Sequence, residues 1–116
     1  MSEVEVWRFD LDGDGAAEEP LSALERRRAA AIVRPLARRR WVAARAALRG
    51  VLGERLGREP AAVEIHTAPG GKPYLVDADD MRFSLSHSGD VALIALRRGG
   101  EVGIDLERVG RRPRAF

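Results

Sequence analysis

The stretch FSLSHSGDVALIAL, residues 83–96, decides the fold of this chain. An alternating run, 83–86, and an apolar run, 91–96, flank the group Ser88-Gly89-Asp90. Serine, glycine and aspartate favour turns, whereas short apolar runs bounded by such residues are typical of strands. The stretch therefore predicts two successive strands of a meander.

Working outward from this stretch, further strand candidates lie on both sides of it. The turn groups Pro69-Gly70-Gly71 and Gly99-Gly100 separate them. At the N-terminus, Val4–Phe9 alternates between apolar and polar residues, as a strand does. The remaining candidates are Val63–His66, Lys72–Val76 and Val102–Glu107.

Between the first strand and the meander, the sequence predicts two helices. Ser22 is a plausible N-cap, and Glu25 three residues later completes a capping box, so a first helix is expected from about Ala23 to Val33. Pro35 suits the first turn of a second helix, which we expect to reach about Leu56 and to end at Gly57.

The second helix has an apolar face and an arginine-rich remainder. The apolar residues predicted to share one face are Trp41, Leu48, Leu52 and Leu56. Four arginines are expected to lie largely off that face: Arg38, Arg45, Arg49 and Arg55. Nineteen of the twenty basic residues are arginine, which we interpret mainly as a compositional bias of surface positions.

The order of strand, two helices and strand meander predicts an α+β fold with a mostly antiparallel sheet. A length of 116 residues fits one small domain or half of a larger one, and 45% hydrophobic residues suffice for a core. Without cysteine, neither a disulfide framework nor a thiolate zinc site can form. No stretch approaches the ~20 apolar residues of a membrane span, and Met1–Asp10 does not read as a signal peptide, so we expect a cytoplasmic protein.

Two short motifs suggest ligands but are incomplete. Asp10–Gly15 resembles the opening of a calcium loop, yet the twelfth position, which should be a bidentate glutamate, is Leu21, so a solvated turn is favoured. Gly70-Gly71-Lys72-Pro73 lacks the spacing and the hydroxyl residue of a Walker motif. It predicts a glycine turn that presents Lys72, the single lysine, from the start of a strand.

The segment Gly103-Ile104-Asp105-Leu106-Glu107 places two carboxylates at i and i+2. On a strand, Asp105 and Glu107 share a face and lie about 6.5 Å apart. A divalent cation can sit between them, completed by waters and a substrate phosphate; a solvated face of an edge strand is the alternative. Ser86 and His87 are strand neighbours and point to opposite faces, so they are not expected to form a catalytic dyad.

These motifs occur together in a fixed order. Gly71-Lys72-Pro73, Phe83–Ser88 and Gly103–Glu107 lie within some forty residues, downstream of the basic helix Arg40–Arg49. In motif, order and spacing, this arrangement resembles the first half of Sfp-type 4′-phosphopantetheinyl transferases, over Leu21 to Arg108. The implied fold is one half of that family's pseudo-dimer.

The resemblance implies transfer of 4′-phosphopantetheine from coenzyme A to a serine of an acyl or peptidyl carrier protein. Asp105 and Glu107 would hold Mg²⁺ on the pyrophosphate, and both, with His87, would form the catalytic set. The residues implied to contact coenzyme A are Lys72, Ser86 and His87 at its phosphates, Arg26 and Arg28 near its 3′-phosphate, and Gly71 and Pro73 at its adenine side.

The family's second half carries a Trp-x-x-Lys-Glu-Ala helix that nothing here matches. We therefore expect residues 1–116 to be an N-terminal half-domain without the C-terminal half, which needs a second half-domain or subunit and is inactive by itself. A catalytically silent module that binds coenzyme A or scaffolds a partner is the alternative. A nucleic-acid-binding role for the arginine helix is disfavoured, because no aromatic stacking platform accompanies it.

Overall fold

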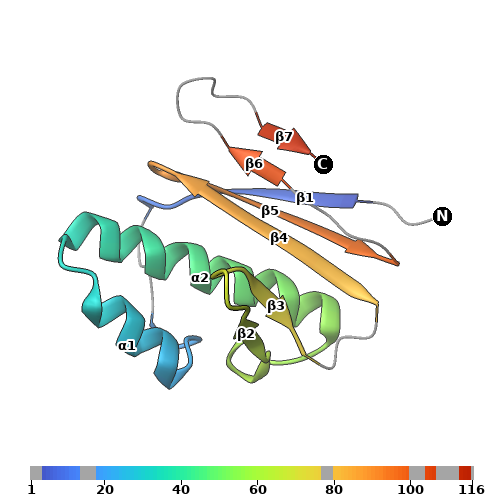
Figure 1. Cartoon of the computed structure of the whole chain (residues 1–116), viewed down its shortest axis with the longest axis horizontal. Helices are drawn as coiled ribbons and strands as arrows, with labels where there is room; N and C mark the ends of the chain where they lie inside the picture. Colours follow the sequence, from blue (N-terminus) through green and yellow to red (C-terminus); the bar gives the residue numbers. More distant parts are fainter. Residues whose placement is uncertain (1–3, 14–17, 77–79, 100–103, 107–112, 116) are drawn as a thin grey trace. The chain divides into compact units, whose positions relative to one another are not determined.

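The computed structural model describes residues 4–13, 18–76, 80–99, 104–106 and 113–115, the last two ranges as backbone only. Its elements follow one another in the predicted order of strand, helices and strands (Figure 1). They are β1 (Val4–Asp10), α1 (Ala23–Ala31), α2 (Pro35–Leu56), the 3-10 turn η1 (Pro60–Ala62), β2 (Ile65–Thr67), β3 (Pro73–Leu75), β4 (Met81–Ser88), β5 (Val91–Arg98), β6 (Ile104–Leu106) and β7 (Pro113–Ala115).

The chain divides into two compact units. The strand unit contains residues 1–8, 64–88 and 92–116, and the helical unit contains residues 9–63 and 89–91. The α+β class with two helices and antiparallel strands is confirmed. In the described part of the chain, no helix is both long and apolar enough to cross a membrane.

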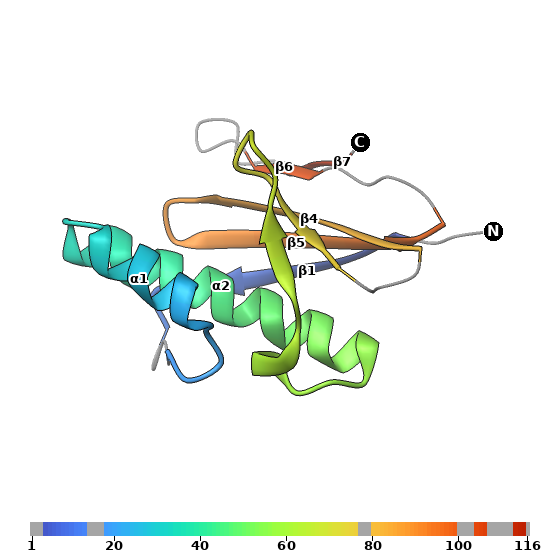
Figure 2. The same cartoon turned by 60° about the horizontal axis from the view of Figure 1, so that its bottom comes forward.

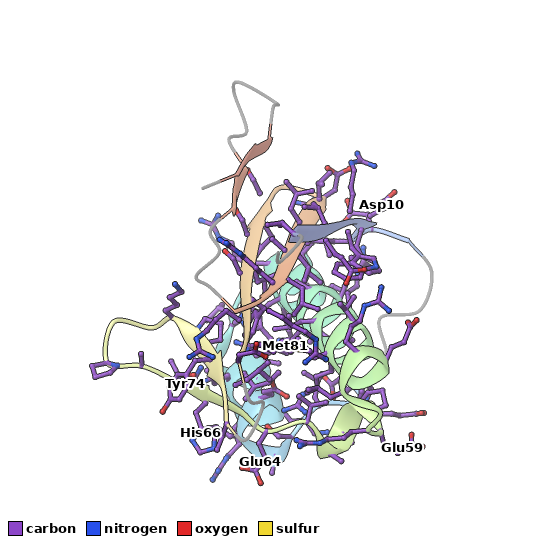
Figure 3. The ribbon with its side chains drawn as sticks, turned by 90° about the vertical axis from the view of Figure 1, so that its right-hand side faces the viewer. Asp10, Glu59, Glu64, His66, Tyr74 and Met81 are labelled. Carbon is purple, nitrogen blue, oxygen red and sulfur yellow. The ribbon has the colours of Figure 1, made fainter. Side chains whose placement is uncertain are left out.

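In the strand unit, β5 is the central strand of a three-stranded sheet with the order β1-β5-β4. Five consecutive residues of β5, Ala92–Leu96, are buried. Because successive strand residues point to opposite faces, burial without alternation means that both faces of β5 are covered. On β4, Met81 and Phe83 are buried as well, and Figure 3 shows Met81 among the interior side chains. The 83–96 stretch thus contains the two predicted strands, β4 and β5, and β5 is the middle strand of the sheet.

Two shorter antiparallel pairs complete this unit. β2 pairs with β3 in a register that places His66 opposite Tyr74, and β6 pairs with β7 with Asp105 opposite Arg114. β3 and β6 both contact β4. β4 is therefore the element that links both two-stranded pairs to the sheet.

In the helical unit, α1 begins as predicted. Ser22 Oγ accepts a hydrogen bond from the backbone N–H of Glu25 (3.1 Å), and Glu25 Oε1 accepts one from the backbone N–H of Ser22 (2.9 Å), which completes a capping box. α1 ends at Ala31, two residues before the expected Val33. Arg38 caps this end, because its guanidinium donates to the carbonyls of Ala30 and Ile32.

The limits of α2 are also as predicted. Pro35 occupies its first turn, and Gly57 ends it in the left-handed region at φ 68°. Packing of α1 against α2 gives the unit a core cluster made of Leu21, Ala29 and Val42 with Trp41 packed against it. Leu48 and Leu52 are completely buried on α2, which confirms the predicted apolar face.

Other features of the local structure differ from the expectations. The strand predicted at Val63–His66 begins only at Ile65, because Pro60–Ala62 form the turn η1 that the sequence did not predict. β7 was not predicted either. More importantly, Arg45 and Arg49 do not lie off the packed face of α2: both are buried.

The acidic turn after β1 is held by an ion pair. Arg40 contacts Asp12 in a bidentate manner, Nε to Oδ1 and Nη2 to Oδ2, both at 2.8 Å. Asp10 Oδ1 accepts the backbone N–H of Asp12. The hydrogen bonds from Arg40 lower the pKa of Asp12 from its ordinary value. Both oxygens of Asp12 thus face an arginine, which supports the solvated turn over the calcium loop.

Gly53 lies where the chain folds back after α2. Its carbonyl accepts the backbone N–H groups of Gly57 and Arg58. A methyl group at this position would lie 2.7 Å from the carbonyl oxygen of Arg58 and 3.3 Å from Pro60 N. Backbone atoms cannot yield as a flexible side chain can, so only glycine fits here without displacing the 58–60 segment.

We expect Gly53→Ala to destabilise the protein by about 1–3 kcal/mol, the usual range for overpacking. Gly50→Ala is a matched control one helical turn earlier, because nothing lies within 4 Å of its added methyl. That change should stabilise the helix by about 0.5–1 kcal/mol. Urea unfolding of the three proteins measures both effects. Equal stability of the two variants would contradict the assigned role of Gly53.

Candidate functional site

Three of the predicted motifs meet around β4 in the strand unit. Lys72 directly precedes β3, Ser86 and His87 lie in β4, and Asp105 lies in β6. Because β3 and β6 both contact β4, the segments that carry these residues are neighbours. The three elements can be followed in Figure 2. Residues more than thirty positions apart in the sequence are thus brought to one part of the unit.

Lys72 is presented by a tight turn. Gly71 has φ 89° and its N–H donates to Ala68 O (2.8 Å), while Ala68 N–H donates to Lys72 O (2.8 Å). Glycine is the residue that adopts this left-handed conformation at no steric cost. The lysine side chain is exposed. The predicted glycine turn that presents one lysine at the start of a strand is therefore present.

On β4, Ser86 is half-buried and His87 is exposed. The strand is continuous through both residues, so their side chains leave opposite faces. This geometry agrees with the expectation that they do not act as a nucleophile and its base. Both residues already interact with other groups of the protein.

Asp105 is the middle residue of β6. Its partner carboxylate Glu107, and Gly103 before the strand, lie outside the described residues. Within the described ranges, no cluster of three or more histidine, cysteine or acidic side chains could hold a metal ion. The donor set that the sequence offers is two carboxylates at i and i+2. Such a set suits Mg²⁺ that is also coordinated by substrate phosphates.

An aromatic pair on the β2–β3 hairpin was missed by the sequence analysis. His66 and Tyr74 face each other across the two strands, with ring centroids 5.9 Å apart (Figure 3). Both side chains are exposed, and His66 Nε2 lies 3.7 Å from Glu64 Oε2. Only the register of β2 and β3 brings these two rings together, and the sequence alone did not predict that register.

The two arginines expected near a 3′-phosphate lie on α1, in the helical unit. Arg26 Nη2 donates to Glu19 O (3.2 Å), so this side chain helps to hold the chain that precedes the helix. Arg28 is exposed in the last turn of α1. The structure therefore places Arg26 and Arg28 in a different unit from Lys72, Ser86, His87 and Asp105.

Glu25 and Arg49 form a buried ion pair that holds α1 to α2. Arg49 is 2% exposed, and its Nε donates to Glu25 Oε1 over 2.6 Å. Its Nη1 donates to Pro60 O (2.9 Å) and to Val63 O (2.7 Å). One guanidinium thus joins both helices to the segment that leads into β2.

Arg45 adds a second buried positive charge next to Glu25. Its Nε lies 3.5 Å from Glu25 Oε2, an oxygen that is buried and accepts no hydrogen bond from the described residues. The guanidinium lies 5.0 Å from the centroid of the Trp41 ring, in cation–π geometry. Burial lowers the pKa of Arg45, and the charges of Arg28 and Arg49 lower it further, while Glu25 opposes them.

The sequence indicated a position for each of these three residues but did not predict the cluster that they form. Glu25 was assigned only to the helix cap, and Arg45 and Arg49 were expected to lie largely off the apolar face of the second helix. The spacing i, i+4 that puts Arg45 and Arg49 together also puts Leu48 and Leu52 together, and these two pairs lie on adjoining parts of the helix surface. The buried face of α2 is therefore wider than the apolar residues alone indicated.

Comparison with known proteins identifies the relatives of this chain. No protein-family model matches it. It is 39% identical over 112 residues to the 4′-phosphopantetheinyl transferase HetI of a Nostoc species, which covers 90% of this chain and 47% of that protein. It is 41% identical over 78 residues to the 4′-phosphopantetheinyl transferase AcpT of Escherichia coli O157:H7 (67% of this chain, 35% of AcpT).

A third relative comes from a fungus. The chain is 36% identical over 100 residues to the L-aminoadipate-semialdehyde dehydrogenase-phosphopantetheinyl transferase of Eremothecium gossypii, with 85% of this chain and 36% of that protein aligned. The chain is thus a homologue of the 4′-phosphopantetheinyl transferases. It spans less than half the length of these relatives.

We expect Arg49→Met to lower the free energy of unfolding by about 3–5 kcal/mol, because it removes the charged hydrogen bond to buried Glu25 Oε1 and the donor to the carbonyls of Pro60 and Val63. The triple variant Glu25→Leu, Arg45→Met, Arg49→Met should recover part of this loss, since it removes the carboxylate together with both buried guanidinium groups that face it. Arg39→Met, an exposed position on the same helix, is the control and should change stability by less than about 0.5 kcal/mol. Thermal and urea unfolding measure the stability of each variant. Similar stability of Arg49→Met and Arg39→Met would show that the buried pair does not stabilise the fold.

Proposed function

We propose that this chain forms the coenzyme A-binding part of a 4′-phosphopantetheinyl transferase, which transfers 4′-phosphopantetheine to a serine of an acyl or peptidyl carrier protein. The single observation that supports this most is the 39% identity to the Nostoc transferase over 90% of the chain. The meeting of the three motif-bearing segments at β4 agrees with it.

In this proposal, the strand unit binds the pyrophosphate. Lys72 supplies a compact, exposed positive charge from the Gly71 turn, and Ser86 and His87 contribute hydrogen bonds from β4. Charge-assisted hydrogen bonds of this kind are shorter and stronger than neutral ones. The resemblance to the transferases assigns Gly71 and Pro73 to the adenine and Arg26 and Arg28 of α1 to the 3′-phosphate.

Asp105 and Glu107 would hold Mg²⁺, whose chemistry is to neutralise charge on the pyrophosphate as it is broken. In the transfer, the carrier serine oxygen forms a new P–O bond to the pantetheine phosphate. The bond from that phosphorus to the bridging oxygen breaks, and adenosine 3′,5′-bisphosphate leaves with the electron pair while the serine proton is lost. The residues of this chain bind and orient the anionic ligand for this step.

Because the chain spans less than half of its relatives, we propose that a second half-domain, in the same polypeptide or another, completes the active site. We expect no useful transfer by the 116-residue chain alone. Mass spectrometry of an apo carrier protein, incubated with coenzyme A and Mg²⁺, measures the product. A substantial mass gain from this chain alone would show that no second half is needed.

We expect Lys72→Ala and His87→Ala each to weaken coenzyme A binding about tenfold to hundredfold, because each removes a charge-assisted hydrogen bond worth about 1.5–3 kcal/mol. His66→Ala is a matched control, since it removes the other histidine, also exposed and also in the strand unit. Calorimetry gives the affinities and thermal melting gives the stability. If Lys72→Ala or His87→Ala mainly unfolds the protein, the role of that residue is structural.

We expect coenzyme A to bind more tightly with Mg²⁺ than with chelator, and Asp105→Ala to abolish the difference. Two carboxylates alone form a weak Mg²⁺ site, because substrate phosphates usually supply further ligands to this ion. The two ligands share one site, so each must raise the affinity of the other by the same factor. Calorimetry measures the affinity for coenzyme A of the wild type and of Asp105→Ala, each with Mg²⁺ and with chelator. Equal affinities in these four measurements would remove Asp105 from the metal site.

A further inference from the structure

The charges around Glu25 do not balance. One buried carboxylate faces two buried arginines, and Arg28 adds a third positive charge whose field acts on Arg45. Arg49 donates a 2.6 Å charged hydrogen bond to Glu25 Oε1, and Arg45 lies 3.5 Å from Oε2. Two buried guanidinium groups therefore share one carboxylate, and the three side chains together carry one excess positive charge.

Arg45 also gains little from its position. Its 3.5 Å approach to Glu25 Oε2 is an ion pair without a hydrogen bond, and the Trp41 ring offers it a further favourable contact. Burying a charge is costly unless the pairing geometry is excellent. The positive charge of Arg45 is therefore only partly compensated by Glu25.

This excess charge lies beside the face of α1 that carries both Glu25 and Arg28. Arg28 lies three residues after Glu25, and residues at i and i+3 share one face of a helix. Arg28 is exposed, whereas Arg45 is buried. An anion that contacts Arg28 from solvent would thus also feel Arg45 behind it, through protein rather than through water.

We infer that Arg45 is a positioning residue for an anion: it supplies the buried positive charge that makes the Arg28 face of α1 receptive to a phosphate dianion. This inference rests on the proposed function, in which that dianion is the 3′-phosphate of coenzyme A. Arg45 itself does not contact the ligand. It acts through Arg28, by adding positive potential and by sharing Glu25 with Arg49.

The test compares coenzyme A with dephospho-coenzyme A, which lacks only the 3′-phosphate. The ratio of their dissociation constants isolates the contribution of this group, and a purely structural loss would change both affinities alike. In Arg45→Met, which keeps much of the volume without the charge, we expect the ratio to fall about threefold to tenfold, the effect of one charge at ~10 Å after screening. The affinity for dephospho-coenzyme A should stay within about twofold.

Two further variants make the result specific. Arg45→Lys retains the charge and should retain the ratio. Arg39→Met removes an equal charge from an exposed position of the same helix and should leave the ratio unchanged. If melting shows that Arg45→Met does not fold, Arg45→Gln replaces it, because its amide can donate to Glu25 Oε2 without carrying charge; the same fall is expected.

The outcomes separate the two proposals. If the wild-type chain binds neither ligand, the proposed function fails, and the inference fails with it. If the wild-type chain prefers coenzyme A but Arg45→Met or Arg45→Gln leaves the ratio intact, only the role of Arg45 is overturned. An equal fall in Arg39→Met would also overturn it, because the effect would then come from net charge and not from the buried arginine.

Discussion

The buried pair of Glu25 and Arg49 is the interaction on which the helical unit depends. A single carboxylate oxygen, Oε1, accepts both the N–H of Ser22 at the start of α1 and the Nε of Arg49 on α2. Arg49 then binds the carbonyls of Pro60 and Val63. The beginning of one helix, the middle of another and the approach to β2 are therefore joined by one pair of side chains, and Arg49 is the member of the pair that contacts all three.

In the strand unit, β4 is the element that joins the other strands, as the pair of Glu25 and Arg49 joins the segments of the helical unit. It borders the buried strand β5 on one side, and it is the strand that both β3 and β6 contact. Ala92–Leu96 of β5 are buried, and β4 places the segments beside Lys72 and Asp105 next to this packed strand. Short strands of three residues, marginal as isolated pairs, thus gain a fixed place next to a well-packed sheet.

The sequence predicted the elements of this fold better than their contacts. Capping signals at Ser22, Pro35 and Gly57 are local, and each was confirmed, because backbone capping depends on a few neighbouring residues. The burial of Arg49 and the pairing of His66 with Tyr74 are not local. They depend on partners 24 and 8 positions away (49 − 25 and 74 − 66), which only the packed chain brings together. The roles of the candidate site residues stay predictions for the same reason: a ligand site is defined by groups that meet in space.

The contrast between arginine and lysine in this chain follows from the same contacts. Composition suggested that the many arginines were a bias of surface positions, yet several use a geometry that lysine lacks. Arg49 directs Nε and Nη1 to different acceptors, Arg40 grips both oxygens of Asp12, and Arg38 bonds two carbonyls at the end of α1. Only the planar fork of a guanidinium provides these paired directions. Lys72 stands on an exposed glycine turn instead, where a single compact charge is presented to solvent and no fork is required.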